Sequence, residues 1–102
     1  MLRASDRAFA ERLVRWVRVD YPIIVDVTLR EGIADPEGAT IERALPALGF
    51  RGVTHVRAGK SFRMNIDAEN ESAALATASA LAERLLSNPV IESATARSDE
   101  KG

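Results

Sequence analysis

The residues of this chain that could carry out acid–base or nucleophilic chemistry are few and widely separated. His55 is the single histidine, and it is predicted to lie in a strand beside the apolar residues Val53 and Val56. A lone histidine in such a position is expected to be structural, because a general base must reach a proton on a reacting group. Ser61 lacks the Gly-x-Ser-x-Gly context of a serine nucleophile. The sequence has no cysteine and no His, Asp or Glu cluster with the spacing of a metal site.

The tripeptide Gly59-Lys60-Ser61 looks like the end of a phosphate-binding P-loop. That motif requires a glycine five positions before Gly59, where this chain has Thr54. It also requires a strand that leads into a helix, whereas Lys60 is predicted to lead into a strand. The sequence therefore excludes a P-loop.

Arg57 and Lys60 form a small cationic pair on either side of a predicted turn at Gly59. Two interpretations are open: a solvated turn in which Gly59 allows a positive φ, or a turn that contacts a partner or its ligands. Arg57 and Asn65 can also be compared with the arginine and asparagine of acylphosphatases. The phosphate-binding loop of those enzymes is missing, however, because the segment 29–35 is acidic and contains one glycine.

A short helix with clear start and stop signals is predicted from Asp35 to Leu48. The aspartate that opens it is a good N-cap, and Pro36 suits the first helical position, where no backbone N–H is needed. Pro46 in the last turn is expected to tighten or bend the helix end. Gly49 is placed for a left-handed C-terminal turn that returns Phe50 onto the helix. The apolar stripe of this helix consists of Ile41, Ala44, Leu45 and Leu48.

Four strands are predicted, over residues 23–30, 53–58, 61–68 and 90–96. The first and third alternate apolar and polar residues with a period of two, which is typical of strands with one buried face. The polar positions of these two strands are Asp26, Thr28, Arg30, Ser61, Arg63, Asn65 and Asp67.

A second helix is predicted to begin near Asn70 or Ser72 and to end before Pro89. Its inward-facing residues are predicted to be Leu75, Ala78, Ala82, Leu85 and Leu86. The order is then β-α-β-β-α-β, an α+β fold of the ferredoxin-like type. Right-handed crossovers would place both helices on one face of a four-stranded antiparallel sheet and leave the other face polar. The two sheet edges could pair with another chain.

The chain is expected to contain an N-terminal leader (1–21), one domain (22–97) and a charged tail (98–102). The net charge of −1 is uneven, since residues 1–18 carry +3 and residues 19–102 carry −4. Ser5 could cap a leader helix with an apolar stripe formed by Phe9, Leu13, Trp16 and Val17. We expect this helix to pack on the domain or on a second copy. The alternatives are a flexible extension, an over-long start, or contact with a membrane surface or nucleic acid.

Length and composition limit the remaining possibilities. A chain of 102 residues is expected to form one domain with a modest core. The acidic domain lacks the basic footprint of a nucleic-acid-binding protein. No apolar run approaches the ~20 residues of a membrane span, and the leader lacks the features of a signal peptide. These properties favour the cytoplasm.

Four short motifs of the chain occur together in one known family. The strand Val-Asp-Val-Thr-Leu-Arg (25–30) precedes the Asp-Pro-x-Gly helix, which ends in Leu-Gly-Phe. Further on come Val-Arg-Ala-Gly-Lys (56–60) and Leu-Leu-Ser-Asn-Pro-Val-Ile-Glu (85–92). In this order and spacing the motifs resemble the PurS family, the small subunits of phosphoribosylformylglycinamidine synthase in purine biosynthesis. The resemblance covers residues 23–96, and the leader departs from the family, whose chains begin close to the first strand.

The resemblance implies a subunit with no active site of its own. Its partners would be a glutaminase and a large ATP-dependent synthetase, which together convert formylglycinamide ribonucleotide, glutamine and ATP into formylglycinamidine ribonucleotide. A homodimer or higher homo-oligomer of this chain would bridge the two, without contacting a membrane or nucleic acid. The chain is expected to bind no cofactor, since ATP and magnesium are implied for the complex. The candidate interface residues are Arg57, Gly59, Lys60, Asn88 and Pro89.

A ligand-sensing module of the ACT type is the main alternative, because it shares the β-α-β-β-α-β order. Such modules usually have a glycine-bearing turn after the first strand that exposes backbone N–H groups to an amino acid. Here Gly32 is the one glycine in that stretch, and Asp35 would repel a carboxylate. A small standalone enzyme is the third possibility.

Overall fold

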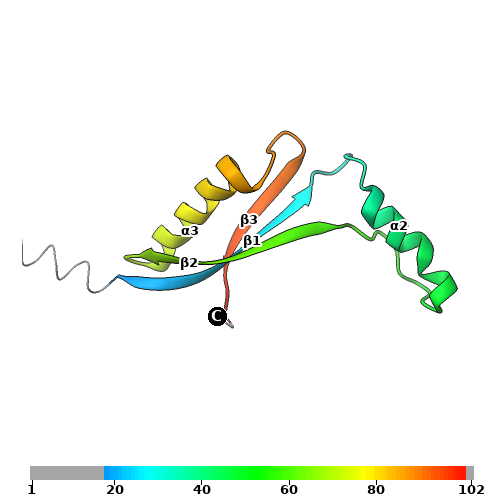
Figure 1. The fold of residues 1–102 in the computed structure, drawn as a ribbon, viewed down its shortest axis with the longest axis horizontal. Coiled ribbons are helices and arrows are strands. Elements are labelled where there is room, and N and C mark those ends of the chain that lie inside the picture. The colour runs from blue at the N-terminus through cyan, green and yellow to red at the C-terminus, as the bar shows by residue number, and fades with distance from the viewer. Residues whose placement is uncertain (1–17, 101–102) are drawn as a thin grey trace, which may run out of the picture.

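The computed structural model describes residues 18–100. Three antiparallel strands form one sheet in the order β2-β1-β3. They are β1 (Val19–Leu29), β2 (Gly59–Ala68) and β3 (Glu92–Ser98). Two helices, α2 (Pro36–Ala44) and α3 (Glu71–Leu81), lie between the strands in the chain. Figure 1 shows α3 lying along the sheet, whereas α2 stands beyond the ends of β1 and β2.

The core lies between α3 and one face of the sheet. Ile23, Val25 and Val27 of β1 point to this face and are at most 1% exposed. Their neighbours on β2 and β3 follow the same alternation, because Val25 pairs with Phe62 on one side and Ala96 on the other. The predicted period of two in the first and third strands is therefore confirmed.

Small residues allow α3 to approach the sheet closely. Ala74, Ala78 and Ala82 are at most 2% exposed and form the helix side of the core. Asn70 caps the helix, since its side-chain oxygen accepts a hydrogen bond of 2.8 Å from the backbone N–H of Ala73. The predicted start near Asn70 is confirmed.

A π-turn over Ala82–Leu86 ends this helix and changes which leucine faces inward. The backbone N–H and the hydroxyl of Ser87 both donate to the carbonyl of Ala82, each at 2.9 Å. Such a turn adds one residue to the helical repeat. Leu86 consequently packs against the core, whereas Leu85 is 74% exposed. The prediction that Leu85 faces inward was wrong.

The first helix has the predicted caps. The Asp35 side chain accepts from Gly38 N–H at 2.9 Å, and Pro36 is the first helical residue. The regular helix stops at Ala44, and a 3₁₀ turn over Pro46–Leu48 follows, as expected for a proline in the last turn. Gly49 has φ +91°, and the N–H groups of Gly49 and Phe50 donate back to Pro46 and Leu45. This is the Schellman arrangement.

Three sequence predictions about residues 35–60 were wrong. Residues 53–58 form no strand, so the sheet has three strands rather than the four of a ferredoxin-like fold. Gly59 and Lys60 do not form a turn but begin β2. The third error concerns α2, which makes no extensive contact with the sheet and therefore does not share a face with α3. The carboxylates of Asp35 and Glu42 accept from two backbone N–H groups, those of Ala58 and Val56, that a strand at 53–58 would use.

The sheet face opposite α3 is polar, as predicted. The alternation places Asp26, Arg63 and Arg97 on this face, together with Thr28, Asn65 and Asp67. Arg97 donates to Asp26 at 2.9 Å from β3 to β1. No layer of residues 18–100 covers this face in Figure 1.

The strand boundaries differ from the predicted ones at both ends of the chain. β1 begins at Val19, within the predicted leader, and β3 runs to Ser98 rather than ending at Ala96. The predicted leader helix falls on residues 1–17, outside the part that the structure describes. Between residues 18 and 100, none of the helices has the length and apolar character needed to cross a membrane.

Candidate subunit interface

Arg57 lies on the segment that joins α2 to β2 and contacts the start of α2. Its guanidinium is 3.8 Å from the carboxylate of Asp35 and 3.5 Å from the carbonyl oxygen of Ile33. The side chain is 45% exposed, so the charge is available to solvent.

Gly59 allows β2 to approach β1 closely rather than to turn. A Cβ at this position would lie 2.8 Å from the carbonyl oxygen of Val27. Gly59 therefore does not form a solvated turn with positive φ, and the glycine is needed for the close contact between the two strands. Gly52 and His55, with φ +80° and +58°, turn the preceding segment instead.

Lys60 points to the same sheet face as α3, beyond the end of that helix. Its Nζ lies 4.0 Å from a carboxylate oxygen of Glu92 and 5.8 Å from the centre of the Phe62 ring. The lysine comes from β2 and the glutamate from β3, so this ion pair spans the central strand.

Asn88 and Pro89 form a turn that is tied to both neighbouring segments. The N–H of Asn88 donates to Glu92 at 2.7 Å, and the Asn88 side chain accepts from Val90 N–H at 3.1 Å. The carbonyl oxygen of Pro89 accepts from Arg30 Nε at 2.9 Å. The turn is thus fixed at the end of the sheet where β1 leaves.

Glu92 joins the two groups of predicted site residues. One of its oxygens faces Lys60 and the other accepts from Asn88. Glu92 is the last residue of the motif at 85–92, and this role was not predicted for it. The position of Glu92, four residues after Asn88, could have predicted its hydrogen bond to that turn. Its pairing with Lys60 could be predicted only from the order of the strands in the sheet.

A hollow of about 320 Å³ lies between this ion pair and the start of α2. Its floor is formed by Val27 and Leu29, and Pro36 lines it on the side of α2. Charged groups line it as well: Asp35, Glu37, Lys60 and Glu92. An apolar floor with a charged rim suits contact with a protein surface.

Two carboxylates of α2 hold the segment 53–58 by its backbone. Asp35 accepts from Ala58 N–H at 2.7 Å as well as from Gly38, and Glu42 accepts from Val56 N–H at 2.9 Å. The hydrogen bond from Gly38, then that from Ala58, then the charge of Arg57 lower the pKa of Asp35. These bonds favour a segment without strand pairing at 53–58, since two of its backbone donors are already used.

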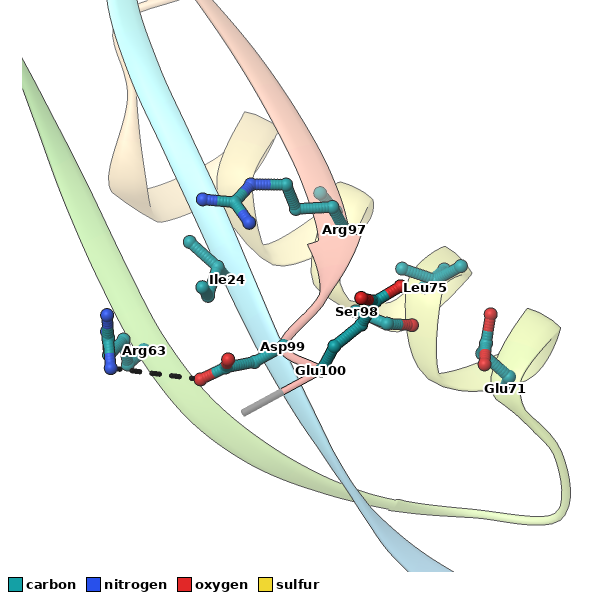
Figure 2. A pocket seen from close by; sticks show the side chains of 9 residues that line it. Ile24, Arg63, Glu71, Leu75, Arg97, Ser98, Asp99 and Glu100 are labelled. Carbon is teal, nitrogen blue, oxygen red and sulfur yellow. Dashed lines mark ion pairs between the residues drawn. The ribbon is translucent and has the colours of Figure 1, made fainter. Parts of the chain in front are cut away.

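The polar sheet face has its own ordered charges. The hydrogen bond from Arg97 lowers the pKa of Asp26, and the same bond raises the pKa of Arg97. Figure 2 shows a second hollow at the edge of this face, where Arg63 of β2 reaches Asp99 at 3.8 Å. Its apolar residues are Ile24, Leu75 and Ala96, and Glu71 and Glu100 add to its acidic rim.

The residues considered for catalysis or for small-molecule sensing are exposed or already hydrogen-bonded. Residues 18–100 contain no group of three His, Cys, Asp or Glu side chains placed to hold a metal ion. His55 is exposed, and its Nδ1 lies 3.2 Å from the Thr54 hydroxyl. The first-turn N–H of Gly38, which an ACT-type site would offer to an amino acid, is occupied by Asp35.

Comparisons with known proteins agree with the motifs quoted above. The model of the PurS family, described as phosphoribosylformylglycinamidine (FGAM) synthase, matches residues 22–100. The PurS subunit of Mycobacterium leprae is 45% identical over 69 residues, which is 68% of this chain and 84% of the relative. The PurS subunit of Archaeoglobus fulgidus is 43% identical over 68 residues, 67% of this chain and 85% of the relative.

Solved structures give the same result for the fold. The PurS subunit of Thermotoga maritima superposes with a TM-score of 0.75 at 34% identity, covering 80% of this chain and 94% of that one. A chain in the PurLQS structure from the same organism superposes with a TM-score of 0.73 at 34% identity, covering 79% and 99%. A PurS structure from Methanocaldococcus jannaschii, named as one subunit of an amidotransferase of purine biosynthesis, gives 0.69 at 35% identity over 78% and 95%.

The family model spans most of the described residues, and the relatives and solved structures named above have between 84% and 99% of their length aligned with this chain. The three strands and two helices superpose as well, and the motifs lie in the elements that carry the candidate interface. The chain therefore belongs to the PurS family and is a PurS subunit of phosphoribosylformylglycinamidine synthase, an enzyme of purine biosynthesis.

Proposed function

We propose that this chain is a non-catalytic subunit that bridges a glutaminase and a large ATP-dependent synthetase. In the assembled enzyme these partners would convert formylglycinamide ribonucleotide, glutamine and ATP into formylglycinamidine ribonucleotide. The observation that carries the proposal is the match to a chain of the PurLQS structure over 99% of that chain's length. Bridging also accounts for a fold whose hydrogen-bonded charges lie at its surface instead of around a reaction centre.

The candidate interface is the charged surface formed by Arg57, Gly59, Lys60, Asn88 and Pro89 around Glu92. Arg57 and Lys60 have side chains that are 45% and 53% exposed. Each already has a carboxylate neighbour, which reduces the number of conformations that a partner would have to fix. A carboxylate of a partner could approach either cation. The charges of Arg57 and Lys60 would then affect mainly the rate and specificity of docking.

ATP and magnesium are assigned to the other subunits in this proposal. Magnesium prefers oxygen ligands in octahedral geometry, with several carboxylates or phosphates around it. The carboxylates of Asp35 and Glu92 do not fit this role, because each accepts from backbone N–H groups and faces a cation. The cytoplasmic location expected from the sequence stays a prediction.

The chain is further proposed to be a homodimer or higher homo-oligomer. Within residues 18–100, β2 and β3 are the outer strands of the sheet, so each has one edge that pairs with no other strand of this part of the chain. Free edges of this kind pair readily with another strand. The polar face with the Asp26–Arg97 pair offers a second surface for a subunit contact.

The test is to reconstitute the enzyme from this chain with the glutaminase and the large synthetase of its own source. Glutamine-dependent formation of formylglycinamidine ribonucleotide is measured with and without the chain. The variant Arg57→Ala/Lys60→Ala should melt like the parent, because exposed charges contribute at most ~0.5 kcal/mol to stability. It should nevertheless lower the glutamine-dependent rate.

The matched control is Arg84→Ala, which removes an exposed cation outside the candidate interface. This variant should support the reaction at the parental rate. If the parent chain neither binds the two subunits nor changes their rate, the bridging function is wrong. If the double variant assembles and supports synthesis like the parent, the bridging function stands but this surface is not the docking site.

A further inference from the structure

β1 extends beyond the end of β3 on the side where the chain enters the sheet. Ser98, the last residue of β3, pairs with Ile23, and the N–H of Asp99 then donates to the carbonyl of Pro22 at 2.8 Å. Residues 19–21 of β1 pair with β2, but no strand within residues 18–100 lies along their other side. We call this stretch the open edge. A strand edge of this kind pairs with other chains unless something covers it.

The second hollow lies beside the open edge. It has a volume of about 760 Å³, and its apolar lining comes from three elements: Ile24 of β1, Leu75 of α3 and Ala96 of β3. Figure 2 shows the hollow between α3 and the end of β3. Val19, at the start of β1, is 50% exposed and adds apolar surface at this end of the sheet. The hollow and the open edge together offer a surface that an apolar side of a helix could cover.

Negative charge is in excess around this surface. Its carboxylates are Asp20, Asp67, Glu69, Glu71, Asp99 and Glu100. Asp20 and Asp67 lie directly opposite each other on β1 and β2, where like charges repel. No ion pair formed within residues 18–100 involves Asp20, Glu71 or Glu100. The acidic end would therefore favour an occupant that carries positive charge.

The residues that precede Arg18 have both properties that this surface calls for. We call residues 1–17 the leader segment; it contains four arginines against two carboxylates, together with the apolar stripe given above. Arg18 itself makes the first contact of this kind. Its guanidinium donates to the carbonyl of Asp67 at 3.0 Å and lies 3.6 Å from the carboxylate of the same residue.

We propose that the leader segment folds back on its own chain as an amphipathic helix and covers the second hollow and the open edge. The lengths agree: a helix over residues 6–17 spans ~18 Å, and the strand from Val19 to Ile24 spans ~17 Å. The apolar stripe, with Phe9, Leu13 and Trp16, then faces the hollow. The arginines beside it face the carboxylates of the rim. The contact is made within one chain and does not depend on the bridging function.

The position and charge of the surface favour this occupant over the others. The leader segment is joined to β1 at Arg18, so its effective concentration at the hollow is in the millimolar range, as for a short tether. A membrane surface with anionic lipids and a nucleic acid are both negatively charged. The acidic end of the sheet would repel either of them, whereas it attracts the leader arginines.

Trp16 is the single tryptophan of the chain, so its fluorescence reports the position of the leader segment. In the parent its emission should be blue-shifted and poorly quenched by acrylamide. Glu71→Lys/Glu100→Lys reverses two exposed charges at the rim. One surface ion pair contributes little, but the two reversals together should raise the equilibrium constant for opening about tenfold. Emission should then shift to the red, with an unchanged fold by circular dichroism.

The matched control is Glu37→Lys/Glu83→Lys. It reverses two exposed carboxylates outside the second hollow, and Glu37 lies in the first turn of α2 as Glu71 does in that of α3. This variant should keep the parental emission. Arg12→Glu/Arg15→Glu should open the leader segment like the rim variant, and the combination with Glu71→Lys/Glu100→Lys should restore the blue-shifted emission.

Paramagnetic broadening distinguishes contact within one chain from contact between two. Because the chain has no cysteine, Ala8→Cys provides a single site for a nitroxide label. The label should broaden the amide signals of Leu75 and Ala96 and leave that of Gly52, beyond α2, unchanged. In a mixture of labelled ¹⁴N copies with unlabelled ¹⁵N copies, Leu75 and Ala96 should stay sharp. Broadening in this mixture alone would overturn the proposal in favour of a leader that docks on a second copy.

Three further results would overturn the proposal. The first is a parental Trp16 emission equal to that of the chain unfolded in urea. The second is a blue shift that requires phosphatidylglycerol vesicles or duplex DNA, which would show a leader segment that binds a membrane surface or nucleic acid. The third is a blue shift that requires the glutaminase or the synthetase, which would show a contact with a partner subunit and leave the bridging function intact.

Discussion

The backbone carbonyl of Val56 lies against Gly38 in the first turn of α2. A Cβ added at Gly38 would be 2.5 Å from this carbonyl oxygen and 2.6 Å from Oδ2 of Asp35. The glycine therefore permits the helix and the segment 53–58 to lie close enough for the Asp35 and Glu42 hydrogen bonds.

Gly38→Ala should loosen α2 without unfolding the sheet. The added methyl group must push away a backbone carbonyl, and overpacking of this kind costs ~1–3 kcal/mol. Hydrogen exchange should show faster opening at Ala58 and Val56, with unchanged protection in β1. The control Ala39→Ser lies next in the helix and is exposed, so it should leave all rates near the parental values. Equal loss of protection in β1 and at Val56 and Ala58 would contradict the local role.

Ala78→Leu should destabilise the sheet and α3 together. Ala78 is fully buried between α3 and the sheet, so there is no room for a larger side chain. Overpacking should lower the free energy of unfolding by ~1–3 kcal/mol, measured by urea denaturation with circular dichroism. Ala80→Leu adds the same group at an exposed position of the same helix and should change stability by ~0.5 kcal/mol or less. Equal effects of the two variants would show that α3 does not pack as described.

Asp35 should make the attachment of α2 dependent on pH. Its pKa lies below the usual ~3.9 because the charged form accepts from Gly38 and Ala58 and faces Arg57. The bonds are therefore fully present above this usual value and are lost as pH falls through the lowered pKa. The ¹H–¹⁵N shifts of Gly38 and Ala58 should titrate together, with a midpoint below ~3.9. Asp35→Asn should abolish this common titration, and a midpoint above ~3.9 would refute the assigned cause.

The isolated chain should release no ammonia from glutamine. It has no cysteine, and the hydroxyl beside His55 is that of the adjacent, exposed Thr54. Ammonia is measured with a coupled glutamate dehydrogenase assay, and a boiled sample of the same preparation serves as the control. Release above that control, retained through further purification, would show a glutaminase site that the proposal does not contain.

Local signals in the sequence predicted the local structure well. Asp35, Asn70 and Gly49 act through neighbours within five residues, so their caps could be read directly. The alternation in β1 also sufficed to identify its buried face. Apolar character at Val53 and Val56, however, gave no sign that distant carboxylates would take the backbone donors of that segment.

The wrong or missing predictions about the candidate interface also concern features without a local signal in the sequence. The outward turn of Leu85 depends on the π-turn at Ser87, which has no simple periodic signal. Lys60 and Glu92 are far apart in the sequence, and their pairing follows from the order of the strands. The residues of the interface could thus be named in part, but their connection through Glu92 could not.

The central position of β1 also determines when this fold can be completed. Ile23 pairs with Ser98, and Leu29 pairs with Glu92, although β1 is the first described element and β3 the last. During synthesis on the ribosome, β1 can pair with β2 early, but its other edge waits until β3 has emerged. Such distant pairing slows folding and leaves a growing chain with a bare strand edge. Nascent chains that stop before Glu92 are accordingly the form most exposed to wrong strand pairing, and the translation of β3 removes that hazard.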